Sequence, residues 1–171
     1  VAIARNPDKT PSLSSHPRVR RVRASLYDFA VIREQLAGCE ACVHVALGWG
    51  DTPVSMLETD TRATVFLLQA CVEQSVQHFI YTSSTAALGG FWSRMSEADP
   101  VRPSDYYGAT KAASEAYVMA VGAKTNLRCN VIRPGYTFGN PVAPGAPTQP
   151  DQRFSSIVKD ALAGRDIRVK R

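Results

Sequence analysis

The segment His78-Phe79-Ile80-Tyr81-Thr82-Ser83-Ser84 decides the fold. Its apolar part predicts a buried strand over residues 77–82, and the chain then changes to hydroxyl side chains. Where such a strand belongs to an open parallel sheet, ligands bind beyond the carboxyl ends of the strands. Ser83 and Ser84 are therefore expected at a binding edge.

Strands and helices alternate on both sides of this segment. The pattern predicts further strands over residues 1–5, 18–24, 41–46 and 128–133. It predicts helices over residues 27–37, 53–74, 104–123 and 151–163, with an irregular segment over 135–150. This alternation is typical of right-handed βαβ units in a parallel sheet, so an α/β fold is expected.

The helix over residues 53–74 is expected to bury an apolar stripe. The stripe recurs at helical spacing and consists of Val54, Leu57, Val65, Leu68 and Val72.

A tyrosine and a lysine share one face of the helix over 104–123. Tyr107 stands four residues before Lys111 in Tyr106-Tyr107-Gly108-Ala109-Thr110-Lys111. A cation beside a phenol favours the phenolate, so the pKa of the tyrosine is expected to fall from about 10. With a serine hydroxyl to hold a substrate oxygen, this pair can move a proton on or off an alcohol or a carbonyl.

The composition indicates a soluble globular domain with a sizeable core. The chain has 171 residues, of which 44% are hydrophobic and 20% charged. No apolar run approaches the roughly 18 residues that span a bilayer, and no secretory signal is visible, so we expect a cytoplasmic protein without a membrane partner. The net charge of +5 comes largely from residues 18–23 and 165–171, where no aromatics interleave with the arginines, which favours a solvated surface over a nucleic-acid site.

Four cysteines raise the question of a metal or redox site. Cys39-Glu40-Ala41-Cys42 fits half of a metal site or a redox pair, but Cys71 and Cys129 stand alone and do not supply the second half. We therefore expect thiols in a reducing compartment and no metal.

Four segments, in this order, resemble those of one known family. They are His44-Val45-Ala46, Tyr81-Thr82-Ser83-Ser84, Tyr107-Gly108-Ala109-Thr110-Lys111 and Arg133-Pro134-Gly135. Together they are far more specific than a tyrosine and lysine at this spacing alone. The chain resembles the extended short-chain dehydrogenase/reductase family, in its NAD(P)-dependent epimerase/dehydratase branch. The resemblance implies a Rossmann-like, doubly wound parallel sheet.

The resemblance also implies a role for each matching residue. Ser84 would be the catalytic serine, Tyr107 the general acid/base, and Lys111 the residue that binds the nicotinamide ribose and lowers the pKa of the tyrosine. Further cofactor contacts would come from Ser25, Leu26, Ala46, Ser83 and Pro134. For Ser83 a hydroxyl that only caps the strand end is an equal alternative, and His44 is expected to be structural because it lies in a buried strand.

Arg5 bears on the choice between NAD and NADP. In dinucleotide-binding folds the residue that ends the second strand reads the ribose 2′ position, where an acid suits NAD and an arginine suits the 2′-phosphate of NADP. Arg5 therefore favours NADP over NAD, and the alternative is a solvated arginine at a strand end.

Two features depart from the family pattern. The opening strand and Gly-rich turn, which hold the pyrophosphate, have no counterpart before Arg5. That strand is central in the order 3-2-1-4-5-6, so its neighbours are expected to be unpaired, and residues 1–171 are expected to be an internal fragment that lacks most of the substrate-binding part. Asp60 stands where the family often has asparagine, which affects the local support of the active site.

The expected function is that of an NAD(P)-dependent oxidoreductase, epimerase or dehydratase on a sugar nucleotide or another small hydroxyl or carbonyl substrate. A non-catalytic dinucleotide-sensing protein on the same fold is the alternative, although such proteins often lose the Tyr or Lys that this chain keeps. The resemblance implies a homodimer through the alanine-rich helix over 104–123. Phe91, Trp92 and Met95 could line a substrate pocket or anchor a loop.

Overall fold

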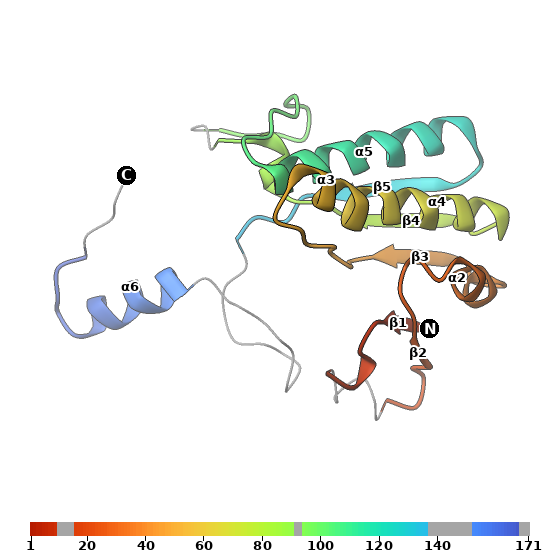
Figure 1. Ribbon diagram of the computed structural model, residues 1–171. Coiled ribbons are helices and arrows are strands. Elements are labelled where there is room, and N and C mark those ends of the chain that lie inside the picture. Colours follow the sequence, from red (N-terminus) through yellow and green to blue (C-terminus); the bar gives the residue numbers. More distant parts are fainter. Residues whose placement is uncertain (10–15, 91–93, 137–151, 168–171) are drawn as a thin grey trace. The chain divides into compact units, whose positions relative to one another are not determined.

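The computed structural model describes residues 1–9, 16–90, 94–136 and 152–167 (Figure 1). The chain divides into two compact units, one of residues 24–135 and one of residues 1–23 with 136–171. Phe91, Trp92 and most of the irregular segment over 135–150 lie outside the described residues.

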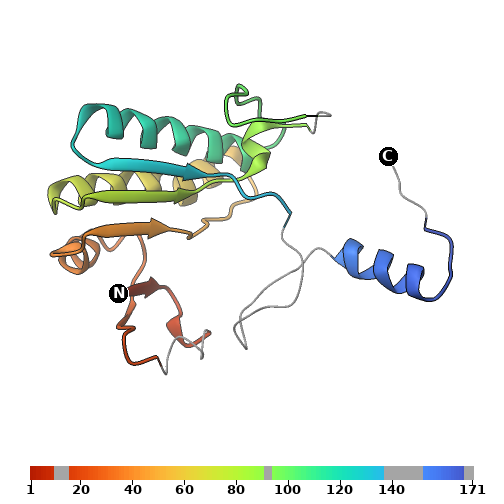
Figure 2. The same ribbon diagram turned by 180° about the vertical axis from the view of Figure 1, so that it is seen from behind.

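The unit of residues 24–135 is built on a parallel sheet. Its strands are β3 (Ala41–His44), β4 (His78–Thr82) and β5 (Arg128–Ile132), in the order β3-β4-β5. Helices α4 (Ala63–Glu73) and α5 (Tyr106–Lys124) connect the strands and lie on one face of the sheet, as the two opposite views show (Figures 1 and 2). Helix α2 (Phe29–Leu36) packs against α4. Every predicted strand and helix of this unit is confirmed.

The core lies between this sheet and its helices. The central strand β4 contributes Phe79 and Tyr81, both fully buried, because successive side chains of a strand point to opposite faces and only these two face the helices. Leu68 of α4 and Val118 of α5 are also fully buried. The opposite face of the sheet is more open, since Val43 is 60% and Ile132 is 53% exposed.

The helix predicted over 53–74 is interrupted by a π-helix. It consists of α3 (Pro53–Met56), the π-helix η2 (Leu57–Arg62) and α4. Thr52 begins it with a reciprocal capping box to Ser55, followed by a proline at the first position, both typical of a helix start.

The apolar stripe expected on this helix is wrong in part. Leu68 is fully buried and Val65 is half-buried, but Val54, Leu57 and Val72 are exposed. The wider turn of the π-helix shifts the positions of the residues that follow it around the helix axis. In and just after η2, the buried side chains are therefore polar, namely Asp60, Thr61 and Thr64.

The second unit contains a parallel pair of short strands. They are β1 (Ala2–Ala4) and β2 (Arg21–Arg23), and both were expected. Between them lies the 3-10 turn η1 (Pro7–Lys9), whose Asp8 pairs with Arg21 at 3.5 Å and with Arg23 at 2.5 Å. Part of the basic stretch is thus neutralised within this unit. Helix α6 (Gln152–Leu162) matches the helix expected over 151–163.

The described strands fall into two separate sheets. β1 and β2 pair with each other, and β3 pairs with β4 but not with β1 or β2.

Two further observations concern ligands and membranes. All four cysteines are free thiols, with Cys71 buried and the others half-buried, and no group of three or more potential metal ligands occurs among the described residues. Within the same residues, no helix has both the length and the apolar character that crossing a bilayer requires.

Candidate active site

The three parallel strands of the β3-β4-β5 sheet end at a common edge. Ala46 follows β3, Ser83 and Ser84 follow β4, and Pro134 follows β5, so four residues predicted for the site lie along this edge. Backbone bonds fix two of the segments to each other, because Ser83 N donates to Ile132 O at 2.7 Å and Thr85 N donates to Pro134 O at 3.1 Å.

Two helix starts meet at the same edge. Asp105 caps α5 by accepting from Gly108 N at 2.7 Å, and Ser84 caps the 3-10 helix η3 (Thr85–Leu88) by accepting from Ala86 N at 3.1 Å. A methyl group on Gly108 would clash with the carbonyl oxygen of Ala86, so only glycine allows the two starts to approach this closely. The approach brings the first turn of α5, which carries Tyr107, against the element that Ser84 begins.

Tyr107 and Lys111 converge, as their spacing predicts. The Lys111 ammonium nitrogen lies 5.8 Å from the centroid of the Tyr107 ring and 5.2 Å from that of the Tyr81 ring. Its charge faces aromatic rings, an attractive arrangement for a cation. Lys111 is only 3% exposed whereas Tyr107 is half-buried, so the phenol is the more accessible of the two side chains.

Ser83 points into the fold. It is 3% exposed, and its hydroxyl donates to the Glu115 carboxylate. Arg133 binds the same carboxylate through two nitrogens at 2.9 and 2.6 Å, and this contact raises the pKa of Arg133. The contacts tie the ends of β4 and β5 to α5.

The network around Glu115 was not found from the sequence. The available signal is that Glu115 follows Lys111 by four residues, so it lies on the helix face that already carries Tyr107.

His44 is structural, as expected. It is 3% exposed, and its Nε2 lies 3.0 Å from the hydroxyl oxygen of Thr64, which itself donates to the Asp60 carbonyl at 2.9 Å. Burial lowers the pKa of His44 to about 4, and the charge of Lys111 acts in the same direction. The imidazole is therefore neutral at pH 7 and supports the helix that follows β3.

The remaining predicted cofactor residues lie near β1 and β2 along the chain. Arg5 is exposed directly after β1, in the smaller unit. Ser25 and Leu26 are half-buried shortly after β2, and Ser25 N donates to the Asp28 carboxylate at 2.6 Å. The edge described above thus gathers Ala46, Ser83, Ser84, Tyr107, Lys111 and Pro134, whereas Arg5, Ser25 and Leu26 belong to other segments.

Comparison with known proteins identifies the family. The whole chain, residues 1–171, matches the model of the NAD dependent epimerase/dehydratase family. The chain belongs to this family. Its membership and the parallel sheet with connecting helices together confirm the Rossmann-like α/β fold.

Three relatives of this family member show how far the similarity extends. The chain is 30% identical over 149 residues to dTDP-glucose 4,6-dehydratase of Streptomyces griseus, which covers 81% of this chain and 44% of the relative. It is 30% identical over 129 residues to 3beta-hydroxysteroid-dehydrogenase/decarboxylase isoform 2 of Arabidopsis thaliana, with coverages of 71% and 23%. The solved structure of MoeE5 in complex with UDP-glucuronic acid and NAD is 27% identical, has a TM-score of 0.71, and is matched over 97% of this chain and 54% of its own. The chain thus spans about half or less of each relative.

In this epimerase/dehydratase-family chain, Asp60 contacts the lysine of the site. Its Oδ2 lies 3.4 Å from Lys111 Nζ, and its Oδ1 accepts from Gly48 N at 3.1 Å. Asp60 belongs to η2, and π-helical turns often occur at functional sites. Asp60 therefore places a carboxylate beside Lys111.

Trp49 lies beside the catalytic candidate and was also not found from the sequence. Its ring centroid is 6.0 Å from that of Tyr107, and it is 65% exposed. The only signal in the sequence is its position in the segment that follows β3, at the carboxyl edge.

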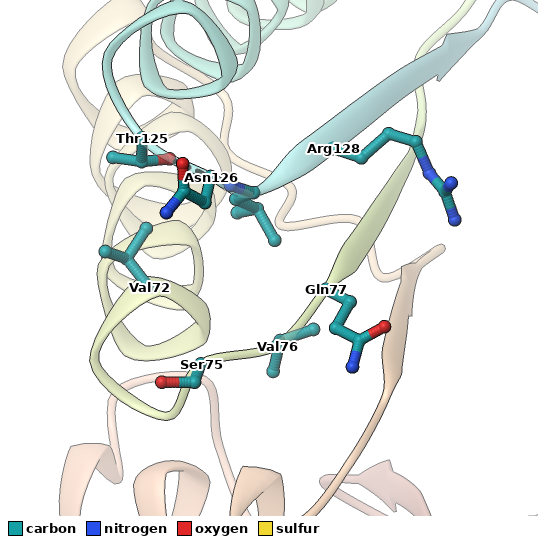
Figure 3. Close-up of a pocket in the computed structure, with 8 residues that line it drawn as sticks. Val72, Ser75, Val76, Gln77, Thr125, Asn126 and Arg128 are labelled. Carbon is teal, nitrogen blue, oxygen red and sulfur yellow. Dashed lines mark hydrogen bonds between the residues drawn. The ribbon is translucent and has the colours of Figure 1, made fainter.

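A cavity of about 640 Å³ lies away from this edge (Figure 3). It is lined by Ser75 after α4, Gln77 before β4, Thr125 after α5 and Arg128 at the start of β5. These positions mark the amino ends of the strands. The cavity includes none of the predicted site residues, so it has no part in the candidate active site.

Proposed function

We propose that this protein is an NAD(P)-dependent oxidoreductase, epimerase or dehydratase that acts on a sugar nucleotide or another small hydroxyl or carbonyl compound. The observation that carries the proposal is the convergence of Lys111 on Tyr107 at the carboxyl edge of the sheet, beside the segment that Ser84 begins. The names of two relatives, a dTDP-glucose dehydratase and a protein solved with UDP-glucuronic acid and NAD, support a sugar nucleotide as the substrate class.

The side chains at this edge divide the proton transfer among them. Tyr107 exchanges a proton with the substrate oxygen as the general acid/base. Ser84 already accepts a hydrogen bond from Ala86 N, so its own O–H can donate to that oxygen. The Lys111 ammonium stabilises the negative charge that develops on the Tyr107 oxygen during the transfer.

The residues present fit the nicotinamide half of a dinucleotide. Ala46 is small and exposed, Pro134 is half-buried, and the Lys111 ammonium has three donors with only Asp60 within ion-pair distance among the described residues. These residues would hold the nicotinamide and its ribose. The bound cofactor would supply or accept the hydride.

The finer cofactor proposal is NADP in preference to NAD. It rests on Arg5, whose exposed guanidinium at the end of β1 suits a 2′-phosphate.

A homodimer through α5 is the proposed assembly. Small residues line an exposed strip of this helix at helical spacing (Ala109, Ala116 and Ala120), with Tyr117, 50% exposed, beside them. Such a strip lets two helices approach closely. Analytical sedimentation of the full-length protein measures its oligomeric state.

The decisive test replaces the phenol alone. In the full-length protein, Tyr107→Phe should lower kcat by about 10²- to 10⁴-fold while dinucleotide binding is retained. Turnover is followed by nicotinamide absorbance, and by product analysis where no net redox change occurs, with a panel of nucleotide sugars. Tyr106→Phe is the matched control, because Tyr106 is 57% exposed on the neighbouring position and should leave kcat unchanged. Full turnover in Tyr107→Phe would refute the assignment, and dinucleotide binding without any turnover in the unaltered protein would favour a sensor.

A further inference from the structure

We propose that Asp60 is a positioning residue that compensates the charge of Lys111 and fixes its ammonium behind Tyr107. This inference rests on the proposed function, because it assigns a role to Asp60 in the same site.

Because both side chains are buried, the charges of Asp60 and Lys111 must compensate each other. The side chains of Asp60 and Lys111 are 1% and 3% exposed, and the atoms that carry their charges lie 3.4 Å apart. Asp60 Oδ2 has no hydrogen-bond partner among the described residues, so the ammonium is what balances this oxygen. A buried charge without a partner is strongly unfavourable, so each of these two groups depends on the other.

The surrounding titratable groups do not replace either partner. His44 on β3 faces the pair with a pKa near 4, and burial raises the pKa of Tyr81 on β4, so both are neutral at pH 7. Partial desolvation raises the pKa of Tyr27, which lies before α2. Glu115 on α5 is occupied by Arg133. Asp60 is therefore the anion that offsets Lys111.

The position of Asp60 is itself fixed from two sides. Thr61, the next residue, donates to the Thr110 carbonyl of α5 at 3.3 Å, which holds η2 against the helix of Lys111. On the other side, Asp60 Oδ1 accepts from Gly48 N, and a methyl on Gly48 would clash with the Thr59 carbonyl. The segment that carries Trp49 to the Tyr107 ring is thus held by the same carboxylate that holds Lys111.

This arrangement sets the charge that Tyr107 experiences. Lys111 places positive potential at the Tyr107 ring, and the Asp60 carboxylate beside it reduces that potential. Asp60→Asn retains an oxygen for Gly48 N but removes the negative charge. Asp60→Ala removes both the charge and the hydrogen bond.

The test measures kcat/KM against pH in the full-length protein. We expect Asp60→Asn to move the acidic limb of the profile to lower pH by about one unit, since the charge of Lys111 is no longer offset. We expect Asp60→Ala to lower kcat/KM about 10- to 100-fold, because the lysine and the Trp49 segment lose their anchor. Glu58→Gln is the matched control on the same turn, an exposed carboxylate paired with Arg62, and should keep the original profile.

A second measurement tests the pair without any need for turnover. Thermal midpoints of Asp60→Asn, Lys111→Met and the double variant form a cycle, and the double variant should lose clearly less than the sum of the single losses. Additive losses would overturn the inference whatever the enzyme does. So would an acidic limb that stays in place, or moves upward, in Asp60→Asn. If the unaltered protein shows no turnover, the proposed function fails, and the cycle alone then decides on the Asp60–Lys111 pair.

Discussion

At the scale of single residues, spacing along one helix predicts which side chains converge. The separation of Tyr107 and Lys111 by one helical turn is enough to place both side chains together, because the helix geometry is fixed. Asp60 and Trp49 approach the same two residues from η2 and from the segment after β3. Their contacts depend on how separate elements pack, which spacing along the chain does not encode.

Arg5 allows a residue-scale test of cofactor preference. Replacing it with Asp should lower kcat/KM for NADP(H) relative to NAD(H) by about 10-fold or more, because a charged hydrogen bond to the 2′-phosphate is lost and a repulsive carboxylate is gained. Arg18→Asp, another exposed arginine of the same unit, should leave the ratio unchanged. An unchanged ratio in Arg5→Asp would mean that Arg5 is only a solvated strand end.

At the scale of elements, the pattern of apolar residues located the β-strands and α-helices of the described residues but misjudged one helix face. The stripe through Val54 and Leu57 assumed a uniform α-helix over 53–74, whereas η2 widens one turn and changes which residues face inward. The spacing of apolar residues in the sequence does not indicate where a π turn occurs. The polar residues that it buries, Asp60 among them, are the ones that shape the site.

The close contact between α5 and η3 leads to a prediction at the scale of elements. Gly108→Ala should lower the free energy of unfolding by about 1–3 kcal/mol, since the added methyl must push α5 away from the Ala86 carbonyl. Turnover should fall with the stability, because Tyr107 moves away from Ser84.

Gly122→Ala in the same helix is the control. Its methyl would meet the Cys129 Cβ at 3.2 Å, and the gain in helix propensity offsets this mild crowding. Urea unfolding of both variants gives the comparison, and equal stability of the two would contradict this account of the helix contact.

At the scale of the whole molecule, the order of elements was predictable and the long-range polar contacts were not. Alternating strands and helices dictate parallel neighbours, and β3-β4-β5 follows that expectation. The bonds from Ser83 and Arg133 to Glu115 join three elements at once, and each of these residue types is common on protein surfaces. Only the folded chain reveals that this carboxylate is 5% exposed and shared.

His44 links the site to the stability of the whole molecule. Its pKa is about 4 in the folded state and near 6.5 when unfolded, so the unfolded chain binds more protons between these values. Stability is therefore complete above pH 6.5 and falls as the pH decreases toward 4. Between pH 7 and pH 5 the free energy of unfolding should drop by about 2 kcal/mol through this group.

In His44→Asn this part of the decrease should vanish, whereas His16→Gln, at an exposed histidine, should keep it. Urea unfolding at the two pH values measures the difference. An unaltered pH dependence in His44→Asn would mean that the imidazole accepts a proton inside the fold, and the neutral contact with Thr64 that supports η2 and Lys111 would then be wrong.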